Sequence, residues 1–121
     1  MVFIGGGLGA ALRHGVNRTA LALFGSSMPW GTLFVNVSGG LMMGIAAQLF
    51  LMRGGGSHEM RLFLTTGFLG GFTTFSAFSL DTVMLWQRGD HIMLALYVTG
   101  SVILSVGALL LGMFTVRALL G

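Results

Sequence analysis

The sequence predicts an all-α membrane protein with four transmembrane helices per subunit, the third of them broken in the middle of the membrane. The 121 residues are 55% hydrophobic and only 7% charged, with a mean hydropathy of +0.92. Soluble domains carry about a quarter charged residues, so a water-soluble fold is excluded. The apolar residues form four segments, and a run of glycine and threonine interrupts the third. We therefore expect a single transmembrane domain over residues 1–121.

Each of the four segments is long enough to cross a bilayer, which takes roughly 20 mostly apolar residues. They cover about residues 2–24, 30–52, 60–86 and 91–120. Pro29 is well placed to start the second helix, because the first turn of a helix leaves its backbone N–H groups unpaired anyway. The first segment lacks the basic region and the cleavage site of a signal peptide, so we expect it to remain as a span.

Pairs of glycines four residues apart occur in three of the predicted helices. The pairs are Gly5 and Gly9, Gly40 and Gly44, and Gly67 and Gly71. This spacing lets membrane helices approach closely, and ordinary helix packing is our interpretation of the first two pairs. Four helices alone rarely enclose a polar pathway, so we expect the chain to form a homodimer.

The arginines are divided between the two ends of the predicted bundle. Arg53, Arg61 and Arg117 lie at one end, and Arg18 and Arg88 lie toward the other. A strong excess on one side normally fixes orientation, so this weak bias predicts insertion both ways, as an antiparallel, dual-topology homodimer in the lipid bilayer. The pI of about 11.3 reflects few charges overall and no basic patch, which excludes nucleic acid as a partner.

Residues 67–79 read Gly-Phe-Leu-Gly-Gly-Phe-Thr-Thr-Phe-Ser-Ala-Phe-Ser, an unusual run inside an apolar segment. Gly70 and Gly71, followed by Thr73 and Thr74, are poor helix formers and predict that the helix unwinds here. Each unpaired backbone group in hydrocarbon costs roughly several kcal/mol unless protein, water or an ion binds it. The freed carbonyls would suit a cation such as Na⁺, so we expect an ion site at the break.

The second segment carries two polar residues, Thr32 and Asn36, on the same helix face as Gly40 and Gly44. Asn36 has two interpretations. Its amide can bond one helix to another, which is worth about 1 kcal/mol or less. Alternatively, its two N–H donors can bind an anion. The residues alone favour neither interpretation.

Two further sets of residues could line a path for ions. Tyr97, Ser101 and Ser105 form a polar stripe on the fourth segment, where serines either bond their own helix or line a pathway. Phe75 and Phe78 lie three apart after the predicted break, and they either pack or turn their partly positive ring edges toward an anion. None of these groups is a carboxylate, whereas cation pores typically use acidic rings or carbonyl cages. The donors together favour a small anion.

The charged residues inside the segments show no pattern of an enzyme. Arg13 falls near the middle of the first segment, where an uncompensated charge costs about 2.5–3.5 kcal/mol on insertion scales, so it must face a partner. Asp81 and Asp90 are expected to cap helices or to pair with Arg88. No His, Asp and Glu residues have the spacing of metal ligands, and nothing positions a nucleophile, a base and an orienting acid together. We expect no enzymatic activity.

Three blocks of the sequence resemble the small bacterial fluoride channels, the family called Fluc or CrcB. They are Gly-Gly-Leu-Gly-Ala-Ala-Leu-Arg at 6–13, Gly-Thr-Leu-Phe-Val-Asn at 31–36, and the run at 67–79. The resemblance covers nearly the whole chain. It implies a dual-topology dimer with two antiparallel pores for passive, selective fluoride conduction. It also implies export of fluoride from the bacterial cytoplasm through the cytoplasmic membrane.

The resemblance assigns roles to particular positions. The residues that match the family's fluoride pathway are Asn36, Phe75, Phe78, Tyr97, Ser101 and Ser105. We add Thr32 to this pathway as a further donor on the second helix. Gly70 and Thr73 match positions whose backbone carbonyls hold a structural Na⁺ at the dimer interface. Arg13 matches a first-helix arginine, which is either a vestibule charge or a structural anchor.

Two other functions compete with the channel. A small dual-topology multidrug transporter has a similar length, but it needs a carboxylate embedded in the membrane, and the first segment has Arg13 and no Asp or Glu. A non-conducting assembly subunit of a larger membrane complex would explain the glycine pairs, but it would leave the polar stripes on three helices without a purpose.

Overall fold

The computed structural model describes residues 1–54 and 57–121, and within them the chain is helical with no strand. The helices are α1 (Val2–Phe24), α2 (Trp30–Arg53), α3 (His58–Leu62), η1 (Phe63–Leu69), α4 (Gly70–Phe72), α5 (Ser76–Gln87) and α6 (His91–Leu120). The wide π-helical turns of η1 join α3 to α4, so these three form one continuous rod. The prediction of an all-α fold is confirmed.

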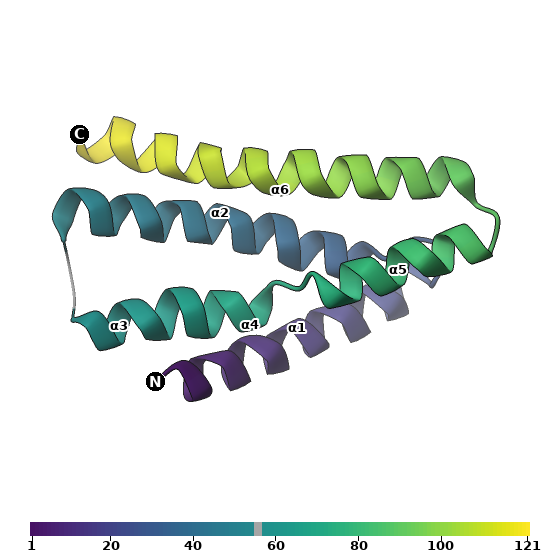
Figure 1. Cartoon of the computed structure of the whole chain (residues 1–121), viewed down its shortest axis with the longest axis horizontal. Helices are drawn as coiled ribbons and strands as arrows, with labels where there is room; N and C mark the ends of the chain where they lie inside the picture. The colour runs from purple at the N-terminus through teal and green to yellow at the C-terminus, as the bar shows by residue number, and fades with distance from the viewer. Residues whose placement is uncertain (55–56) are drawn as a thin grey trace.

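Helix α1, helix α2, the stretch from α3 to α5 and helix α6 run roughly along one direction, each in the opposite sense to the one before it (Figure 1). Both termini, the end of α2 and the start of α3 lie at one end, while the α1–α2 and α5–α6 turns lie at the other. Three stretches are long and apolar enough to cross a membrane: Trp30–Arg53, His58–Gln87 and His91–Leu120. The 23-residue helix α1 is not among them, because polar side chains interrupt its second half, so its predicted membrane pass stays a prediction.

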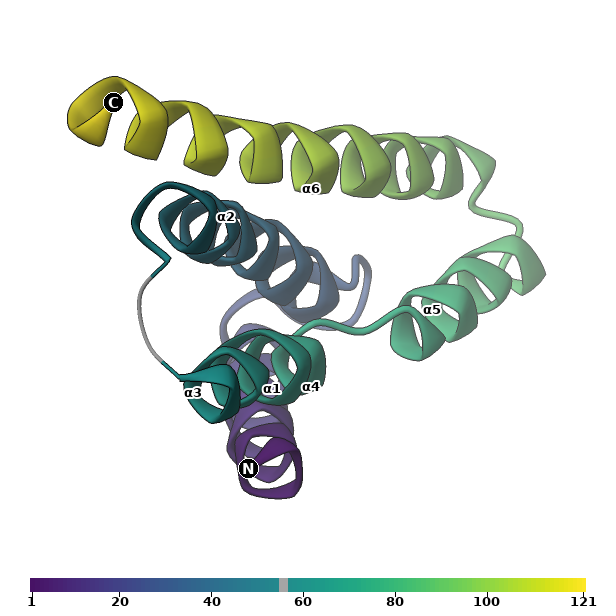
Figure 2. The same cartoon turned by 60° about the vertical axis from the view of Figure 1, so that its left-hand side comes forward.

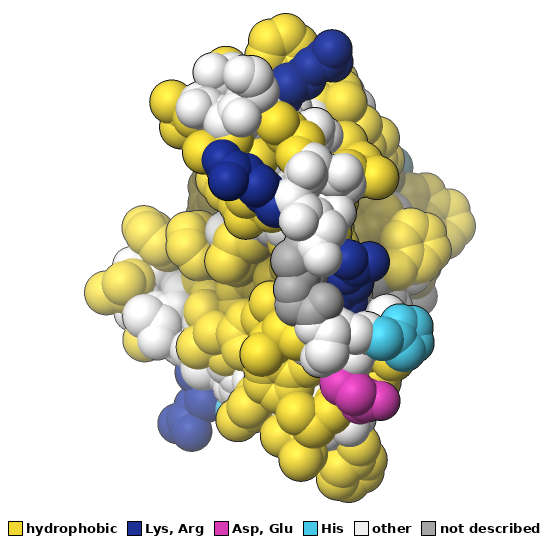
Figure 3. Space-filling view, turned by 90° about the vertical axis from the view of Figure 1, so that its left-hand side faces the viewer, with side chains coloured by type: hydrophobic (Ala, Val, Ile, Leu, Met, Phe, Trp, Pro, Cys, Tyr) yellow, Lys and Arg dark blue, Asp and Glu magenta, His cyan; other side chains and the backbone are white. Residues whose placement is uncertain are grey.

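The surface of the molecule is mainly apolar. Large hydrophobic side chains such as Phe3, Leu51 and Leu119 are more than 70% exposed, and few side chains are fully buried. Figure 3 shows hydrophobic groups spread over one end of the molecule with only scattered charged side chains between them. Water would destabilise such a surface, whereas lipid tails cover it without penalty. The chain is a multi-pass membrane protein.

Helix α2 lies in the middle of the structure, with α6 on one side and with α1 and α4 on the other (Figure 2). Glycine brings α2 and α6 together: a Cβ atom at Gly40 would lie 2.7 Å from the carbonyl oxygen of Ser105. A Cβ atom at Gly112 would lie 2.5 Å from the carbonyl oxygen of Leu41. No side chain fits in either place, so the helix-packing interpretation of the Gly40 pair is confirmed.

Helix α1 supports the broken helix from the other side. A Cβ atom at Gly5 would lie 2.6 Å from the carbonyl oxygen of Phe63, and one at Gly9 would lie 2.8 Å from the backbone nitrogen of Phe72. A Cβ atom at Gly71 would in turn meet the Cα atom of Gly6 at 3.0 Å. The helix-packing interpretation of the Gly5 and Gly9 pair is therefore confirmed as well.

The break in the third helix is present, and it begins in the second half of the predicted run from Gly70 to Thr74. Gly70 has ordinary right-handed helical angles, and the N–H of Thr73 still bonds the carbonyl of Leu69. The chain leaves the helix at Thr73, whose backbone is extended (φ −83°, ψ 160°), and α5 starts at Ser76. Gly71 serves close packing against α1, and the unwinding falls on the threonines that follow.

We predict that Gly9→Leu lowers stability, because the new side chain must push α1 away from the backbone of α4. Overpacking of this kind typically costs about 1–3 kcal/mol. Gly7→Leu is the matched control, since no atom lies within 4 Å of a Cβ at that position. The midpoint of thermal unfolding in detergent, followed by circular dichroism, checks the difference, and equal midpoints for the two variants would contradict the packing.

Candidate functional site: a polar cavity at the break of the third helix

Asn36 holds the unwound backbone in place. Its Oδ1 atom accepts the N–H of Thr74 at 2.8 Å, and its Nδ2 atom donates to the carbonyl of Thr74 at 3.0 Å. The side-chain amide thus replaces both hydrogen bonds that Thr74 loses when the helix opens. Of the two interpretations of Asn36, the contact between helices is observed, and one N–H of Nδ2 remains for another acceptor.

Arg13 reaches the break from α1. Its Nε atom donates to the carbonyl oxygen of Gly71 at 3.1 Å, and the side chain is half-buried. A carbonyl at the end of a helix lacks its usual donor, and a charged donor bonds it more strongly than a neutral one. Of the two roles that remained open for Arg13, this contact is the one expected of a structural anchor.

Thr74 also supports the first turn of α5. Its Oγ1 atom accepts the N–H of Ala77 at 3.1 Å, three residues on, which is the usual geometry of a helix cap. The same hydroxyl lies 3.3 Å from the Oγ atom of Ser76. The short non-helical segment is therefore held at both ends by specific side chains.

A cavity of about 420 Å³ opens at this break. Its lining residues are Asn36, Gly70, Thr73, Thr74, Phe75, Phe78, Ser101, Val102, Ser105 and Val106. The structure thus brings together, from α2, the broken helix and α6, most of the residues predicted for the fluoride pathway and both residues predicted for the cation.

The two serines on α6 leave their hydroxyl groups available. The Oγ atoms of Ser101 and Ser105 are buried, and neither has a hydrogen-bond partner among the residues that the structure describes. Serines in membrane helices usually bond a carbonyl one turn earlier, as Ser38 does with Phe34 at 2.6 Å. A buried hydroxyl without a partner is unfavourable, so the cavity suits a ligand that accepts hydrogen bonds.

The aromatic rings form a short row along the cavity wall. The ring centroids of Phe75 and Phe78 are 5.7 Å apart, and those of Phe78 and Tyr97 are 5.3 Å apart. Phe78 is half-buried, whereas Phe75 is 78% exposed on the single chain. Phe75 therefore offers most of its ring to something outside this chain.

Tyr97 and Thr32 lie outside this cavity. Tyr97 is fully buried, and its hydroxyl donates to the Oδ2 atom of Asp81 at 3.1 Å. The expectation that Asp81 caps a helix or pairs with Arg88 is wrong: it lies within α5 and bonds Tyr97. Arg88 instead donates to the carbonyls of Ser26 and Ser27, at 3.2 and 3.1 Å.

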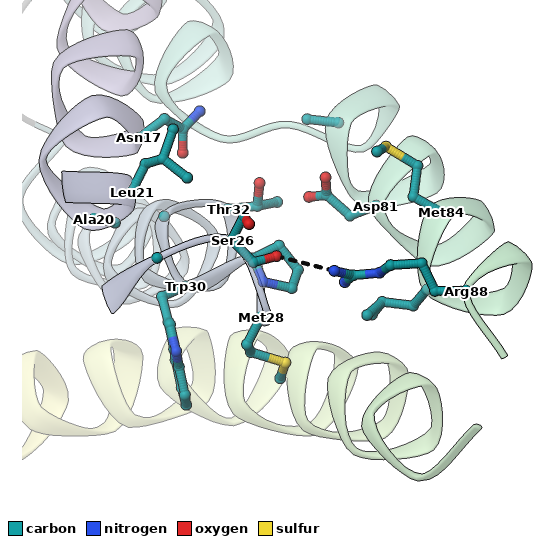
Figure 4. A pocket seen from close by; sticks show the side chains of 15 residues that line it. Asn17, Ala20, Leu21, Ser26, Met28, Trp30, Thr32, Asp81, Met84 and Arg88 are labelled. Atoms are coloured by element: carbon teal, nitrogen blue, oxygen red, sulfur yellow. Dashed lines mark hydrogen bonds between the residues drawn. The ribbon is translucent and has the colours of Figure 1, made fainter. Parts of the chain in front are cut away.

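A second cavity of about 420 Å³ lies at the α1–α2 turn. Figure 4 shows Thr32 and Asp81 facing each other across it, with Arg88 bonded to Ser26. The polar residues predicted for the fluoride pathway therefore divide between two cavities. Tyr97 lines neither cavity, and its side chain reaches from α6 to Asp81 of α5. The sequence analysis did not predict that Asp81 lines this second cavity, because Asp81 comes to lie opposite Thr32 only through the packing of α5 near α2.

No group of three His, Asp or Glu side chains within residues 1–54 and 57–121 could hold a metal ion. Asp90 stands at the N-cap of α6 without a side-chain hydrogen bond to that helix. A cation at the break would therefore rely on backbone carbonyls. The carbonyl of Gly70 fits this role, because the N–H of Thr74, its partner in a regular helix, bonds Asn36 instead.

These features define a class: a small multi-pass membrane protein with a polar cavity at the break of one helix. The sequence profile of the family described as "CrcB-like protein, Camphor Resistance (CrcB)" matches residues 1–113. The chain belongs to this family.

Similar proteins cover almost the full chain. This chain is 50% identical over 119 residues to the "Fluoride-specific ion channel FluC" of Rhodopseudomonas palustris (strain BisB5), and the match covers 98% of this chain and 96% of the relative. It is also 50% identical over 120 residues to the protein of that name from Granulibacter bethesdensis, with 99% and 94% covered. These relatives are named as ion channels and not as enzymes, which agrees with the expectation of no enzymatic activity.

We predict that Asn36→Leu destabilises the chain, because it leaves the N–H and the carbonyl of Thr74 without partners at once. An unsatisfied buried group costs about 1–3 kcal/mol. The control is Ser38→Ala on the same helix, which removes only an exposed bond to Phe34. Thermal unfolding and amide hydrogen exchange at Thr74 measure the loss of stability. An Asn36→Leu chain as stable and as protected from exchange as the control would show that the two Asn36–Thr74 hydrogen bonds do not hold the break.

Proposed function

We propose that the protein is a fluoride-selective channel that passively exports fluoride across the bacterial cytoplasmic membrane. The observation that carries this proposal is the cavity at the break, where the buried hydroxyls of Ser101 and Ser105 lack acceptors and no carboxylate lines the wall. A small anion satisfies such donors, and excluding acidic groups removes the repulsion that it would meet. The printed names of the relatives support the same ion.

We further propose that two copies assemble as an antiparallel, dual-topology dimer with two pores. One chain leaves Phe75 78% exposed beside the cavity, so its pathway has an open side. A second copy would cover that ring with its own surface. The nearly even division of arginines between the two ends supports insertion in both orientations.

A structural Na⁺ at the centre of this dimer would be held by backbone carbonyls. Gly70 and Thr73 both line the cavity, and the carbonyl of Gly70 has lost its helical donor to Asn36. Na⁺ prefers several oxygen ligands, so equivalent carbonyls of the second copy would complete the set. Such a cation would supply positive charge near the anion path and join the two subunits.

The direct test is ion efflux from liposomes that contain the purified full chain. We expect fluoride to leave at least about a hundredfold faster than chloride, because the donors favour a small anion that needs strong hydrogen bonds. Liposomes without protein set the background. Equal rates for the two anions would overturn the proposed selectivity, and a monomeric chain without any efflux would favour the assembly subunit instead.

Ser101→Ala should slow fluoride efflux by about tenfold, since a hydrogen bond to a charged group is worth about 1.5–3 kcal/mol. It should leave the unfolding temperature unchanged, because the hydroxyl has no partner within the described part of the chain. Thr115→Ala on the same helix is the control, as its exposed hydroxyl bonds only Leu111. Normal efflux through the Ser101 variant would show that this hydroxyl does not contact the ion.

A further inference from the structure

Two arginines at one end of the molecule take no part in the cavities described above. Arg53 lies in the last turn of α2 and Arg117 lies in the last turn of α6, and both side chains are exposed. Neither forms a hydrogen bond or an ion pair with any residue that the structure describes. A positive charge is favourable near the C-terminus of a helix, but this effect leaves the N–H donors of the guanidinium groups unpaired.

The two arginines lie at the same end because α2 and α6 run in the same direction and finish together. A Cβ atom at Gly121 would lie 3.4 Å from the Cε atom of Met52, the residue before Arg53. Arg117 lies about one helical turn before Gly121. Figure 3 looks onto this end and shows arginine side chains (dark blue) against the apolar surface. Like charges repel each other, so an anion that both arginines contact would be favourable here.

The other charged side chains at this end do not supply that anion. The Nη2 atom of Arg61 donates to the carbonyl of Gly54 at 3.0 Å, and its guanidinium carbon lies 5.3 Å from the ring centroid of Phe50. Glu59 lies in the first turn of α3 and is exposed, but within the described residues it makes no ion pair with Arg53 or Arg117. The two arginines are therefore available to a ligand from outside the chain.

An apolar groove runs along α6 to the same end. It has a volume of about 510 Å³ and extends from Gly107 to Leu119, so Arg117 lies near its outer end. Of its described lining residues, only Thr115 carries a polar side chain, and that hydroxyl donates to the carbonyl of Leu111 at 2.7 Å. The groove thus offers no unpaired polar side chain, which suits a hydrocarbon chain.

The length and the place of the groove fit a lipid. From residue 107 to residue 119 a helix rises about 18 Å, and one leaflet of a hydrocarbon core is about 15 Å thick. Val102 and Val106, which line the cavity at the break, lie on another face of α6 than Gly107 and Leu111. A second copy that covers the cavity at the break would therefore not need to cover the groove.

We propose that this end of the protein binds an anionic phospholipid, with an acyl chain in the groove on α6 and the phosphate group at Arg53 and Arg117. Guanidinium groups suit phosphate oxygens, because they present several N–H donors in a planar fork. A zwitterionic lipid carries the same phosphate, but its cationic headgroup is repelled by the two arginines. This site goes beyond the proposed channel and does not depend on which ion the protein conducts.

The test is native mass spectrometry of the purified full chain in a neutral detergent. The chain is titrated with phosphatidylglycerol and, separately, with phosphatidylcholine of the same acyl chains. We expect phosphatidylglycerol to bind at least about tenfold more tightly, since an arginine near an anionic lipid contributes about fivefold in affinity and two are present. Inorganic phosphate at the same concentration should leave phosphatidylglycerol binding unchanged, because it has no chain for the groove.

Arginine variants test the headgroup site. Arg53→Gln and Arg117→Gln should each weaken phosphatidylglycerol binding about fivefold, and the double variant about twentyfold. Arg18→Gln is the matched control, because Arg18 is also exposed and has no partner among the described residues, but it lies toward the other end of the molecule. It should leave the affinity within about twofold.

A second pair of variants tests the groove. Gly107→Leu fills its inner end, and no atom lies within 4 Å of a Cβ at this position, so the fold should be kept. Gly100→Leu is the control, since its Cβ would be equally open but lies outside the groove. We expect Gly107→Leu to weaken phosphatidylglycerol binding at least about fourfold, the contribution of roughly one buried CH₂ group. Equal unfolding midpoints of all variants without lipid verify that each one folds.

Three results would overturn the proposal. If Arg18→Gln weakens binding as much as the double variant does, the chain only attracts anionic lipid in general. If inorganic phosphate displaces phosphatidylglycerol, the arginines form an anion site without a lipid. If Gly107→Leu changes the fraction of dimer and not the lipid affinity, a second copy covers the groove. None of these results bears on fluoride conduction, which the efflux measurement tests separately.

Discussion

The two hydrogen bonds between Asn36 and Thr74 are the interaction on which the rest of the structure depends. A helix that opens inside hydrocarbon exposes N–H and carbonyl groups, each of which costs roughly several kcal/mol when unpaired. One side-chain amide satisfies both groups of the same residue, at 2.8 and 3.0 Å. It also fixes α2 against the break, so the open segment has one defined position. Without that position the cavity beside it would have no fixed wall.

Close helix packing makes this arrangement possible. Arg13 can reach the carbonyl of Gly71 only because α1 lies against the broken helix without side chains between them, as the contact between Gly6 and Gly71 shows. On the other side, Gly40 lets α6 approach until Ser105 faces the cavity. Glycine therefore brings helices together on both sides of the break, and the polar side chains that these helices carry then meet at one place.

Local sequence patterns predicted the helical segments and the existence of a break, because apolar length and poor helix formers act over a few residues. They gave the run from Gly70 to Thr74 as the break but not which of its residues leave the helix, because the partner of Thr74, Asn36, lies 38 residues earlier in the chain. The bond between Tyr97 and Asp81 could not be predicted for the same reason, since it depends on how α5 packs against α6. Most of the cavity lining was predicted: helical spacing indicated Phe75 with Phe78 and Ser101 with Ser105, while the resemblance to the fluoride channels implied roles for Asn36, Gly70 and Thr73.

A broken helix has two ends of opposite polarity, so in the proposed channel one break would serve ions of both signs. The end at α4 leaves carbonyl oxygens, which carry partial negative charge, and the start of α5 leaves N–H groups, which carry partial positive charge. The structure assigns a cationic side chain, Arg13, to the first end and hydroxyl donors, such as Ser101, to the cavity at the second. In the proposed channel, an anion in the cavity and a cation at the Gly70 and Thr73 carbonyls would each lower the energy of the other. Selection of a small anion would then need no lysine or arginine within the cavity, because the backbone at the break would supply part of the positive field.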